Sequence, residues 1–296
     1  MALVHAPSPA AAASGLHRAQ LVEQRMRRLC TGLDHPGTVF ALALEGHLAA
    51  GGQRARSRVS LTSSQRLGLA ESDAVALAAT VELLHNASLI QDDLQDRAQV
   101  RRGSATVWSK YGPDCAIGLT DLAISAAFRS LADVSEPRRI PGLIDWVHRA
   151  ITTTLRGQTE DLSERITDLD GAIALARRKS GPLFGLALGL PLYFADQQEA
   201  LGTASEAAES FGVGYQIYDD LVDLDEDRAC HSCSNLVIVL EKTLPAEAAR
   251  AETRRLAEHY LGAATAAAIS LPGCSGQGLV DLSEEVGHRL NLLSNA

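Results

Sequence analysis

Apolar residues recur at spacings of three and four along most of the chain, and alanine and leucine dominate at those positions. This is the period of one face of an α-helix, whereas the two-residue alternation of a β-strand is almost absent. Glycine and proline mark the ends of the helical segments and leave roughly 15 to 25 residues between successive breaks. The predicted breaks fall at Gly51-Gly52, Gly112-Pro113, residues 137–141, Gly181-Pro182, Pro191, Pro245 and Pro272-Gly273. We therefore expect a nearly all-helical protein.

Two of these segments, residues 74–90 and 115–131, are apolar on nearly all sides, as expected of helices in the middle of a bundle. No repeat of solenoid length and no charged or Gly/Ser-rich linker divides the chain. The Ala-, Pro- and Ser-rich start lacks the order of charged and apolar residues that a signal peptide has. We expect a flexible tail over residues 1–15 and one helical domain over residues 16–296.

The composition, 46% hydrophobic and 21% charged over 296 residues, is that of a globular protein with a sizeable core. The net charge of -9 makes binding of nucleic acid unfavourable. No run of 18 or more uncharged apolar residues occurs, so we expect no membrane span. The odd number of cysteines, five, does not suit a disulfide framework, and we expect a cytoplasmic protein.

Two acidic clusters with the same spacing carry the candidate chemistry. Asp92, Asp93 and Asp96 end the apolar segment that contains His85, and Asp92 and Asp96 project from one helical face about 6 Å apart along its axis. The second cluster follows residues 211–218 and consists of Asp219, Asp220 and Asp223, with Asp225, Glu226 and Asp227 after it. Two matching clusters predict two facing helix walls.

Oxygen-only ligands suit a hard cation, and Mg²⁺ usually takes one or two carboxylates together with waters and phosphate oxygens. A diphosphate is therefore the expected substrate group. A single acidic cluster could instead be a solvated helix end, but two, each ending an apolar helix, favour cation binding because charge beside a core is costly. Cationic groups suited to a diphosphate are Arg56, Arg101, Arg102 and Lys179.

The two segments around these clusters resemble the trans-isoprenyl diphosphate synthases, also called polyprenyl synthetases. Residues 83–112 read LLHNASLIQDDLQDRAQVRRGSATVWSKYG, and residues 214–227 read GYQIYDDLVDLDED. The resemblance extends through GGQRAR (51–56), GQTEDL (157–162) and KSG (179–181), in the order and spacing of the family, and covers about residues 40 to 245.

The resemblance implies an all-helical, terpenoid-synthase-type bundle with a central active-site cavity. It also implies a homodimer that joins isopentenyl diphosphate to an allylic diphosphate. About three Mg²⁺ ions would be bound, with Asp92, Asp96 and Asp219 as direct ligands. The outer or water-mediated partners would be Asp93, Asp220, Asp223, Gln158 and Asp161.

The family pattern also assigns the substrate contacts. Arg101 and Lys179 would hold the allylic diphosphate and, with the three ligand aspartates, form the catalytic set. Isopentenyl diphosphate would be held by Arg56, His85 and Arg102, together with Gln53. Gln216 and Ser180, the latter in place of a more usual threonine, would flank the allylic cation.

The chain departs from the family at two positions. Gln53 stands where the family has a lysine, so a cation is missing from the predicted isopentenyl diphosphate site. Residues 225–245 replace a loop that usually carries a Gly-Lys pair, and Lys242 is the candidate substitute. The loss of two cations leaves three explanations: a weakened synthase, a synthase tuned to another co-substrate, or a cyclase-like enzyme that ionises a prenyl diphosphate without elongating it. A further alternative is a non-catalytic partner subunit.

The remaining predictions concern product length and one cysteine pair. Ala87 and Ser88 lie roughly 6 to 7.5 Å before Asp92 along the helix, and both are small, so growth past the farnesyl stage is not blocked there. The sequence HNASL resembles geranylgeranyl diphosphate synthases, which makes geranylgeranyl diphosphate the expected product, with farnesyl diphosphate second. Cys230, His231 and Cys233 form an isolated CxxC that we interpret as incidental.

Overall fold

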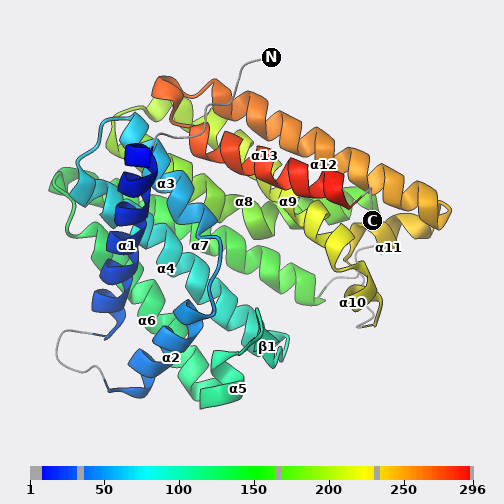
Figure 1. Cartoon of the computed structure of the whole chain (residues 1–296), viewed down its shortest axis with the longest axis horizontal. Helices are drawn as coiled ribbons and strands as arrows, with labels where there is room; N and C mark the ends of the chain where they lie inside the picture. Colours follow the sequence, from blue (N-terminus) through cyan, green and yellow to red (C-terminus); the bar gives the residue numbers. More distant parts are fainter. Residues whose placement is uncertain (1–8, 32–36, 164–167, 230–233, 294–296) are drawn as a thin grey trace. The chain divides into compact units, whose positions relative to one another are not determined.

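The computed structural model confirms the nearly all-helical prediction (Figure 1). It describes the backbone of residues 9–31, 37–163, 168–229 and 234–293, and the side chains of all of these except 9–14 and 160–163. Within these ranges the chain forms thirteen α-helices, three short 3-10 helices and one hairpin of two short strands. It divides into two compact units, Met1–Leu61 with Leu69–Ile140, and Thr62–Gly68 with Pro141–Ala296. The predicted division into a tail and one domain stays a prediction.

The first unit is built around its longest helix, α4. Its elements are α1 (Pro9–Thr31), α2 (Val39–Ala49), the first part of α3 (Ala55–Arg66), α4 (Glu71–Gln95), β1 (Val100–Arg101), β2 (Ser104–Ala105), α5 (Val107–Tyr111), α6 (Pro113–Leu131) and η1 (Pro137–Arg139). Helices α1 and α6 both pack on α4. Among the described helices, α4 alone is long and apolar enough to cross a membrane, but 83% of its apolar window is buried in the protein, as expected of a core helix.

A tight β-hairpin follows α4 and carries Arg101 in its first strand and Arg102 in its turn. Val100 pairs with Ala105 and Arg101 with Ser104, so the connection is the two residues Arg102 and Gly103. Both have positive φ, 51° and 75°, which is the backbone of a type I′ turn. A side-chain hydrogen bond anchors the segment that leads into the hairpin: Trp108 Nε1 donates to the carbonyl oxygen of Ala98 at 2.8 Å.

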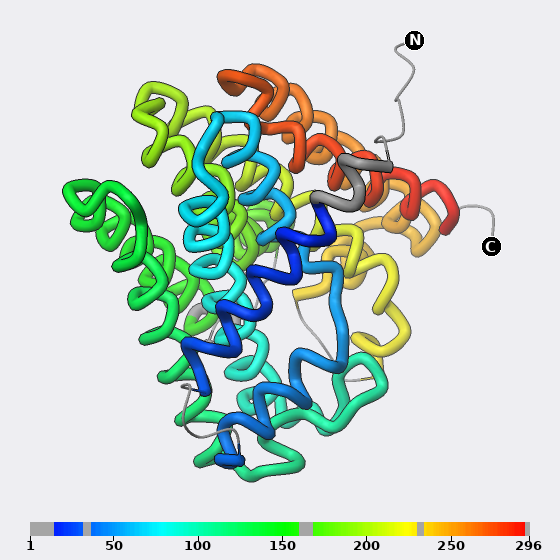
Figure 2. The backbone as a smooth tube through the Cα atoms, turned by 60° about the vertical axis from the view of Figure 1, so that its left-hand side comes forward, coloured from blue at the N-terminus to red at the C-terminus, as the bar shows by residue number. Residues whose placement is uncertain are grey.

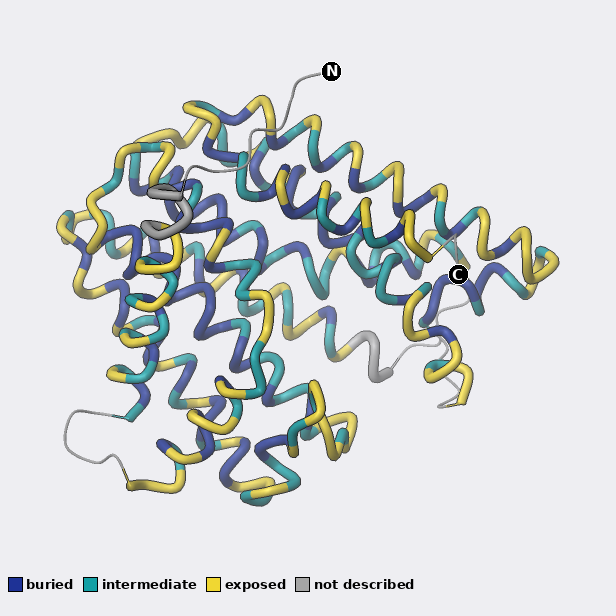
Figure 3. Tube along the Cα trace, viewed as in Figure 1, coloured by how far each residue is buried: buried dark blue, intermediate teal, exposed yellow. Residues whose placement is uncertain are grey.

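The second unit centres on α9, which packs against α8 and α12. Its elements are the last part of α3, α7 (Ile140–Ser163), α8 (Leu169–Phe194), η2 (Gln198–Ala200), α9 (Leu201–Val222), α10 (Leu224–Ala229), α11 (Leu236–Glu241), α12 (Ala246–Ile269), η3 (Pro272–Cys274) and α13 (Gln277–Leu292). Helices α12 and α13, orange and red, run side by side (Figures 1 and 2). Buried and exposed residues alternate along α12 with the helical period (Figure 3), so one face of this helix packs on the unit.

Most predicted breaks are confirmed, but those at Gly181-Pro182 and Pro191 are wrong, because α8 runs through them. Each internal proline costs roughly 3 kcal/mol by removing an amide donor and crowding the preceding turn. Burial outweighs this cost, since Pro191 and nearly all of its neighbours are buried. Gly181 instead lies where α8 and α9 approach each other closely. A Cβ on Gly212 of α9 would lie 2.8 Å from the amide nitrogen of Gly181.

Candidate functional site

The first acidic cluster lies at the C-terminal end of α4. Asp96 is the C-cap residue, and its amide donates to the carbonyl oxygen of Asp92 at 2.9 Å. Asp92 is half-buried and Asp96 is exposed, one turn apart. A helix C-terminus carries negative partial charge, so carboxylates there are unfavourable unless a cation joins them. This end of α4 is therefore suited to bind a cation.

The middle aspartate of the cluster points inward. Asp93 is only 1% exposed, and its Oδ1 accepts from Arg101 Nε of the hairpin at 2.7 Å. Burial raises the pKa of the Asp93 carboxyl, while Arg101 opposes that rise. Asp93 therefore ties the hairpin to α4 and orients it, while Asp92 and Asp96 remain accessible beside it.

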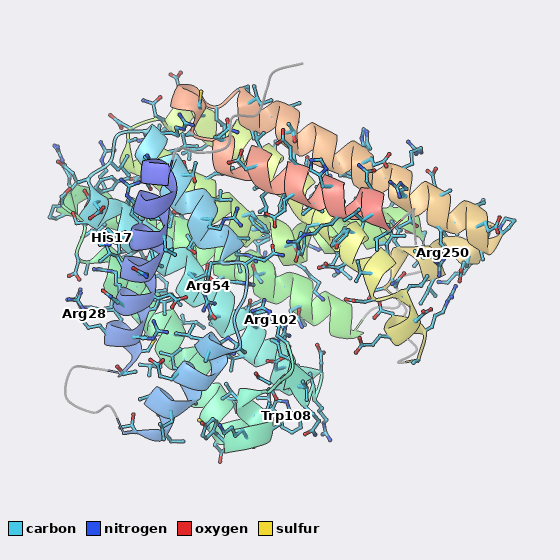
Figure 4. All side chains as sticks on the ribbon, in the orientation of Figure 1. His17, Arg28, Arg54, Arg102, Trp108 and Arg250 are labelled. Carbon is cyan, nitrogen blue, oxygen red and sulfur yellow. The ribbon has the colours of Figure 1, made fainter. Side chains whose placement is uncertain are left out.

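The turn of the hairpin contacts the glycine pair that precedes α3. Arg102 Nη1 donates to the carbonyl oxygen of Gly51 (Figure 4 labels Arg102). Gly52 has a φ of +142°, and a Cβ at this position would clash with the same nitrogen. The Arg102 guanidinium therefore sits directly on a backbone segment that only glycine can form.

Arg56 and His85 form a pair on the first unit. Arg56 Nη1 lies 3.0 Å from His85 Nε2. The pKa of His85 is held well below its ordinary value by burial, and further by the neighbouring Arg56, Arg102 and Arg101. His85 is thus a neutral ring among three guanidiniums, and this cationic cluster has the charge that an anion requires.

A second neutral histidine predicts acid sensitivity. Burial, together with the nearby Arg101 and Arg54, lowers the pKa of His47 to about 4. His47 Nε2 forms a hydrogen bond with Asn86 Oδ1 at 3.1 Å. The unfolded chain takes up this proton near pH 6.5, so the free energy of unfolding falls as pH is lowered from about 6.5 to 4. Urea unfolding at pH 7 and pH 5 should show a loss on the order of 2 kcal/mol larger in the native protein than in His47→Gln. Equal losses in both proteins would contradict this.

The second acidic cluster repeats the arrangement of the first at the end of α9, in the second unit. Asp219 is half-buried, Asp220 is buried and Asp223, the C-cap residue, is exposed. Asp220 Oδ2 accepts from the amide of Leu236 at 2.9 Å, and burial raises the pKa of Asp220 to about 7. The pKa of Asp223 is also raised, by the partial burial of its carboxyl and by the neighbouring Asp227 and Glu226. That the two clusters form facing walls stays a prediction.

Three residues predicted from the sequence line one small pocket in the second unit. Lys179 of α8 and Gln216 and Asp220 of α9 share its wall with Ser234 and Leu236. Gln216 Nε2 approaches Asp220 Oδ1 at 3.5 Å. A cation, an amide and a carboxyl thus converge at the end of α9.

The other predicted residues are placed as follows. Ser180 and Gln158 are half-buried on α8 and α7, Gln53 is exposed in the loop before α3, Ala87 is buried and Ser88 is half-buried on α4. Ser88 Oγ donates to the carbonyl oxygen of His85 at 2.8 Å. Cys230, His231, Cys233 and the side chain of Asp161 lie outside the described residues.

The sequence interpretation missed Asn235, which organises the segment after the second cluster. This side chain is 1% exposed, and its Nδ2 donates to the carbonyl oxygen of Asp220 at 2.8 Å and to Asp227 Oδ2 at 2.7 Å. Its Oδ1 accepts from the amide of Val237 at 3.0 Å, which caps α11. An asparagine before the apolar run LVIVL is an N-cap signal, but the contacts with α9 have no local signature.

Replacing Asn235 by alanine should lower the free energy of unfolding by about 2–4 kcal/mol, because the cap is lost and buried partners are left unpaired. Chemical denaturation measures the change. Asn235→Asp keeps the cap acceptor but places a buried carboxylate oxygen against Asp227 Oδ2 and the carbonyl oxygen of Asp220, so it should destabilise the protein at least as much as alanine does. If alanine had no effect, the contacts with Asp220 and Asp227 would not stabilise this segment.

Comparisons with known proteins show which family and fold this chain is similar to. The family model described as polyprenyl synthetase matches residues 38–231. Geranylgeranyl pyrophosphate synthase of Geoglobus acetivorans is 30% identical over 213 residues, 70% of this chain and 66% of that protein. Geranylgeranyl diphosphate synthase of Methanosarcina mazei is 30% identical over 181 residues, 59% of this chain and 56% of that protein. The matches thus span less than two thirds of these relatives' lengths.

The solved structures match the fold over more of the chain. Geranylgeranyl pyrophosphate synthetase from Geoglobus acetivorans superposes with a TM-score of 0.80 at 24% identity, covering 92% of this chain and 98% of that one. Relatives named for farnesyl, geranylfarnesyl and nonaprenyl products match at 27–34% identity. Similarity at this level therefore does not distinguish product length.

Proposed function

Because the chain belongs to the polyprenyl synthetase family, we propose that it is a Mg²⁺-dependent trans-prenyltransferase. It would condense isopentenyl diphosphate with an allylic diphosphate to give geranylgeranyl diphosphate, with farnesyl diphosphate as the second candidate product. The observation that carries this proposal is a set of three arginines near the acidic end of α4: Arg56 contacts His85, Arg101 contacts Asp93 and Arg102 contacts the Gly51 carbonyl oxygen. This supports the proposal because one unit carries cations suited to a diphosphate together with candidate metal ligands.

The donor set fits Mg²⁺. Among the described residues, no three His, Cys, Asp or Glu side chains form a complete protein cage for a metal. Asp92 and Asp96 instead offer accessible oxygens at the end of α4, and Asp219 does so at the end of α9. This suits an ion that keeps waters and takes phosphate oxygens as its other ligands. When bound, Mg²⁺ neutralises diphosphate and makes it a better leaving group.

The protein groups divide the remaining tasks. Lys179 and Arg101 would hold the allylic diphosphate by charge-assisted hydrogen bonds, and Arg56, His85 and Arg102 would hold isopentenyl diphosphate. Gln53 can donate a hydrogen bond but no charge, which predicts weaker binding of isopentenyl diphosphate than a lysine would give. Ser180 and Gln216 would lie beside the allylic carbon skeleton, which must be kept from water while it carries positive charge.

Product length is proposed from α4. Ala87 is buried, and Ser88 Oγ donates to the carbonyl oxygen of His85 on the same helix. Both side chains are small, so neither places a large group one turn before Asp92. Small residues at this depth leave room for a chain longer than farnesyl. This supports a 20-carbon product.

Two further parts of the proposal are a homodimer, which the family resemblance implies, and a cytoplasmic location, which the odd number of cysteines supports. Val39 and Leu42 of α2 and Ile117 of α6 are large apolar side chains that are 47–53% exposed in the single chain, as is common at protein contacts. Light scattering of the purified protein tests the dimer, and localisation of a tagged chain in the source cell tests the compartment.

The deciding experiment incubates purified protein with Mg²⁺, isopentenyl diphosphate and one allylic diphosphate at a time, with a chelator control. Mass spectrometry then measures both diphosphate and hydrocarbon products. We expect elongated diphosphates ending at 20 carbons. Diphosphate release without elongation would support the cyclase-like alternative, which Gln53 and residues 225–245 motivate. Turnover that requires an added family member would support the partner-subunit alternative.

A further inference from the structure

A carboxylate that belongs to neither acidic cluster lies in the core of the first unit. Glu82, on α4, is 1% exposed, and its Oε2 accepts from the amide of Ser57 at 3.1 Å. Its Oε1 lies 3.8 Å from Arg54 Nη1. A buried charge is costly unless it is paired and hydrogen-bonded, so these partners are what make Glu82 tolerable at this position.

The partners of Glu82 are the residues that set the path of the glycine loop. Arg54, at a φ of +49°, donates from Nη2 to the carbonyl oxygen of Leu48 at 3.1 Å and from Nε to Glu23 Oε1 at 3.1 Å (Figure 4 labels Arg54). Ser57 Oγ donates back to the carbonyl oxygen of Arg54 at 3.0 Å. Arg54 therefore joins the end of α2 to α1, and Glu82 joins the start of α3 to α4.

The next turn of α4 extends the same network. Asn86 Nδ2 donates to the carbonyl oxygen of Glu82 at 2.7 Å, and Asn86 Oδ1 bonds the His47 ring on α2 at 3.1 Å. His85 lies between Glu82 and Asn86 in sequence and contacts Arg56, which lies between Arg54 and Ser57. Each member of the Arg56–His85 pair is thus flanked by residues of the buried network.

We propose that Glu82 is a positioning residue for isopentenyl diphosphate. It holds Arg54 and the Ser57 amide, and through them it places the Gly51-Gly52 loop and the Arg56 guanidinium against His85. This inference rests on the proposed function. Glu82 does not touch substrate, so its loss should weaken binding of isopentenyl diphosphate and leave the allylic diphosphate, assigned to Arg101 and Lys179, unaffected.

The test is calorimetric binding of each diphosphate separately, with Mg²⁺ present and no turnover, to the native protein and to Glu82→Gln. The variant keeps the shape but places an amide beside Arg54 and removes the charge. We expect the Kd of isopentenyl diphosphate to rise at least about tenfold, as for a weakened charge-assisted hydrogen bond. The Kd of geranyl diphosphate should change less than about twofold.

Thr80→Val is the matched control. Thr80 is also fully buried on α4, and its Oγ1 donates to the carbonyl oxygens of Ala76 at 2.9 Å and Ala127 at 3.2 Å, away from the glycine loop. It should lower stability without changing either Kd. A rise in the isopentenyl diphosphate Kd of Thr80→Val equal to that of Glu82→Gln would show a general packing effect and overturn the inference.

Arg54→Gln supplies a second variant if Glu82→Gln does not fold, and the double variant tests the route. If Glu82 acts through Arg54, the double variant should bind isopentenyl diphosphate no more weakly than the weaker single variant. Additive losses would overturn this route. Native-like binding by Glu82→Gln would overturn the inference while the proposed function stands, whereas a native protein that binds no isopentenyl diphosphate would overturn the proposed function itself.

Discussion

Replacing Asp92 or Asp219 by alanine should reduce turnover by at least about a thousandfold and leave the fold intact. Asp92 is half-buried at the end of α4, and Asp219 occupies the equivalent position at the end of α9. Neither is the inward-facing aspartate of its cluster, so its removal takes oxygens from the accessible end of a helix. Steady-state kinetics measures the loss, and circular dichroism with thermal unfolding shows that the structure is retained.

The controls for these substitutions are exposed carboxylates on helices of the same units. Asp121 lies on α6 in the first unit, and Glu206 lies on α9 itself, more than three turns before Asp219. Asp121→Ala and Glu206→Ala change the net charge by the same amount and should keep native turnover. Retained activity in either Asp92→Ala or Asp219→Ala would contradict the proposed prenyltransferase.

The second large effect is expected from Gly52→Ala. A Cβ at this position would meet the Arg102 guanidinium, which is the mobile end of a long side chain and will move. Its displacement breaks the contact with the Gly51 carbonyl and moves one of the charges assigned to isopentenyl diphosphate. The KM of isopentenyl diphosphate should therefore rise at least about tenfold, with little change in the KM of the allylic substrate.

Gly51→Ala separates this displacement from backbone strain. Gly51 also has a positive φ, +80°, but a Cβ there meets no atom within 4 Å. Both alanine variants should lose about 1–2 kcal/mol of stability from the unfavourable φ, and Gly52→Ala alone should also displace Arg102. Equal rises in the KM of isopentenyl diphosphate would show that strain in the loop, and not the position of Arg102, controls binding.

Much of the candidate site could be predicted because its signals are local. The four-residue spacing of Asp92 and Asp96, and of Asp219 and Asp223, places each pair on one helical turn whatever the helix packs against. The proximity of Arg56 to His85 was implied only by the family pattern, since these residues are 29 positions apart. A contact between residues so far apart in sequence depends on how α3 packs against α4, which the periodicity of apolar residues does not encode.

The sequence by itself determined the helical class, because helical period and Gly/Pro breaks depend only on neighbouring residues. It also determined that both acidic clusters end helices and which family the chain resembles. The tertiary structure decided that Asp93 and Asp220 point inward, that α8 continues through Pro182 and Pro191, and that Glu82 and Asn235 are buried anchors. The reason is physical: burial and hydrogen bonds between distant segments outweigh local preferences by several kcal/mol, and they exist only once the helices have packed.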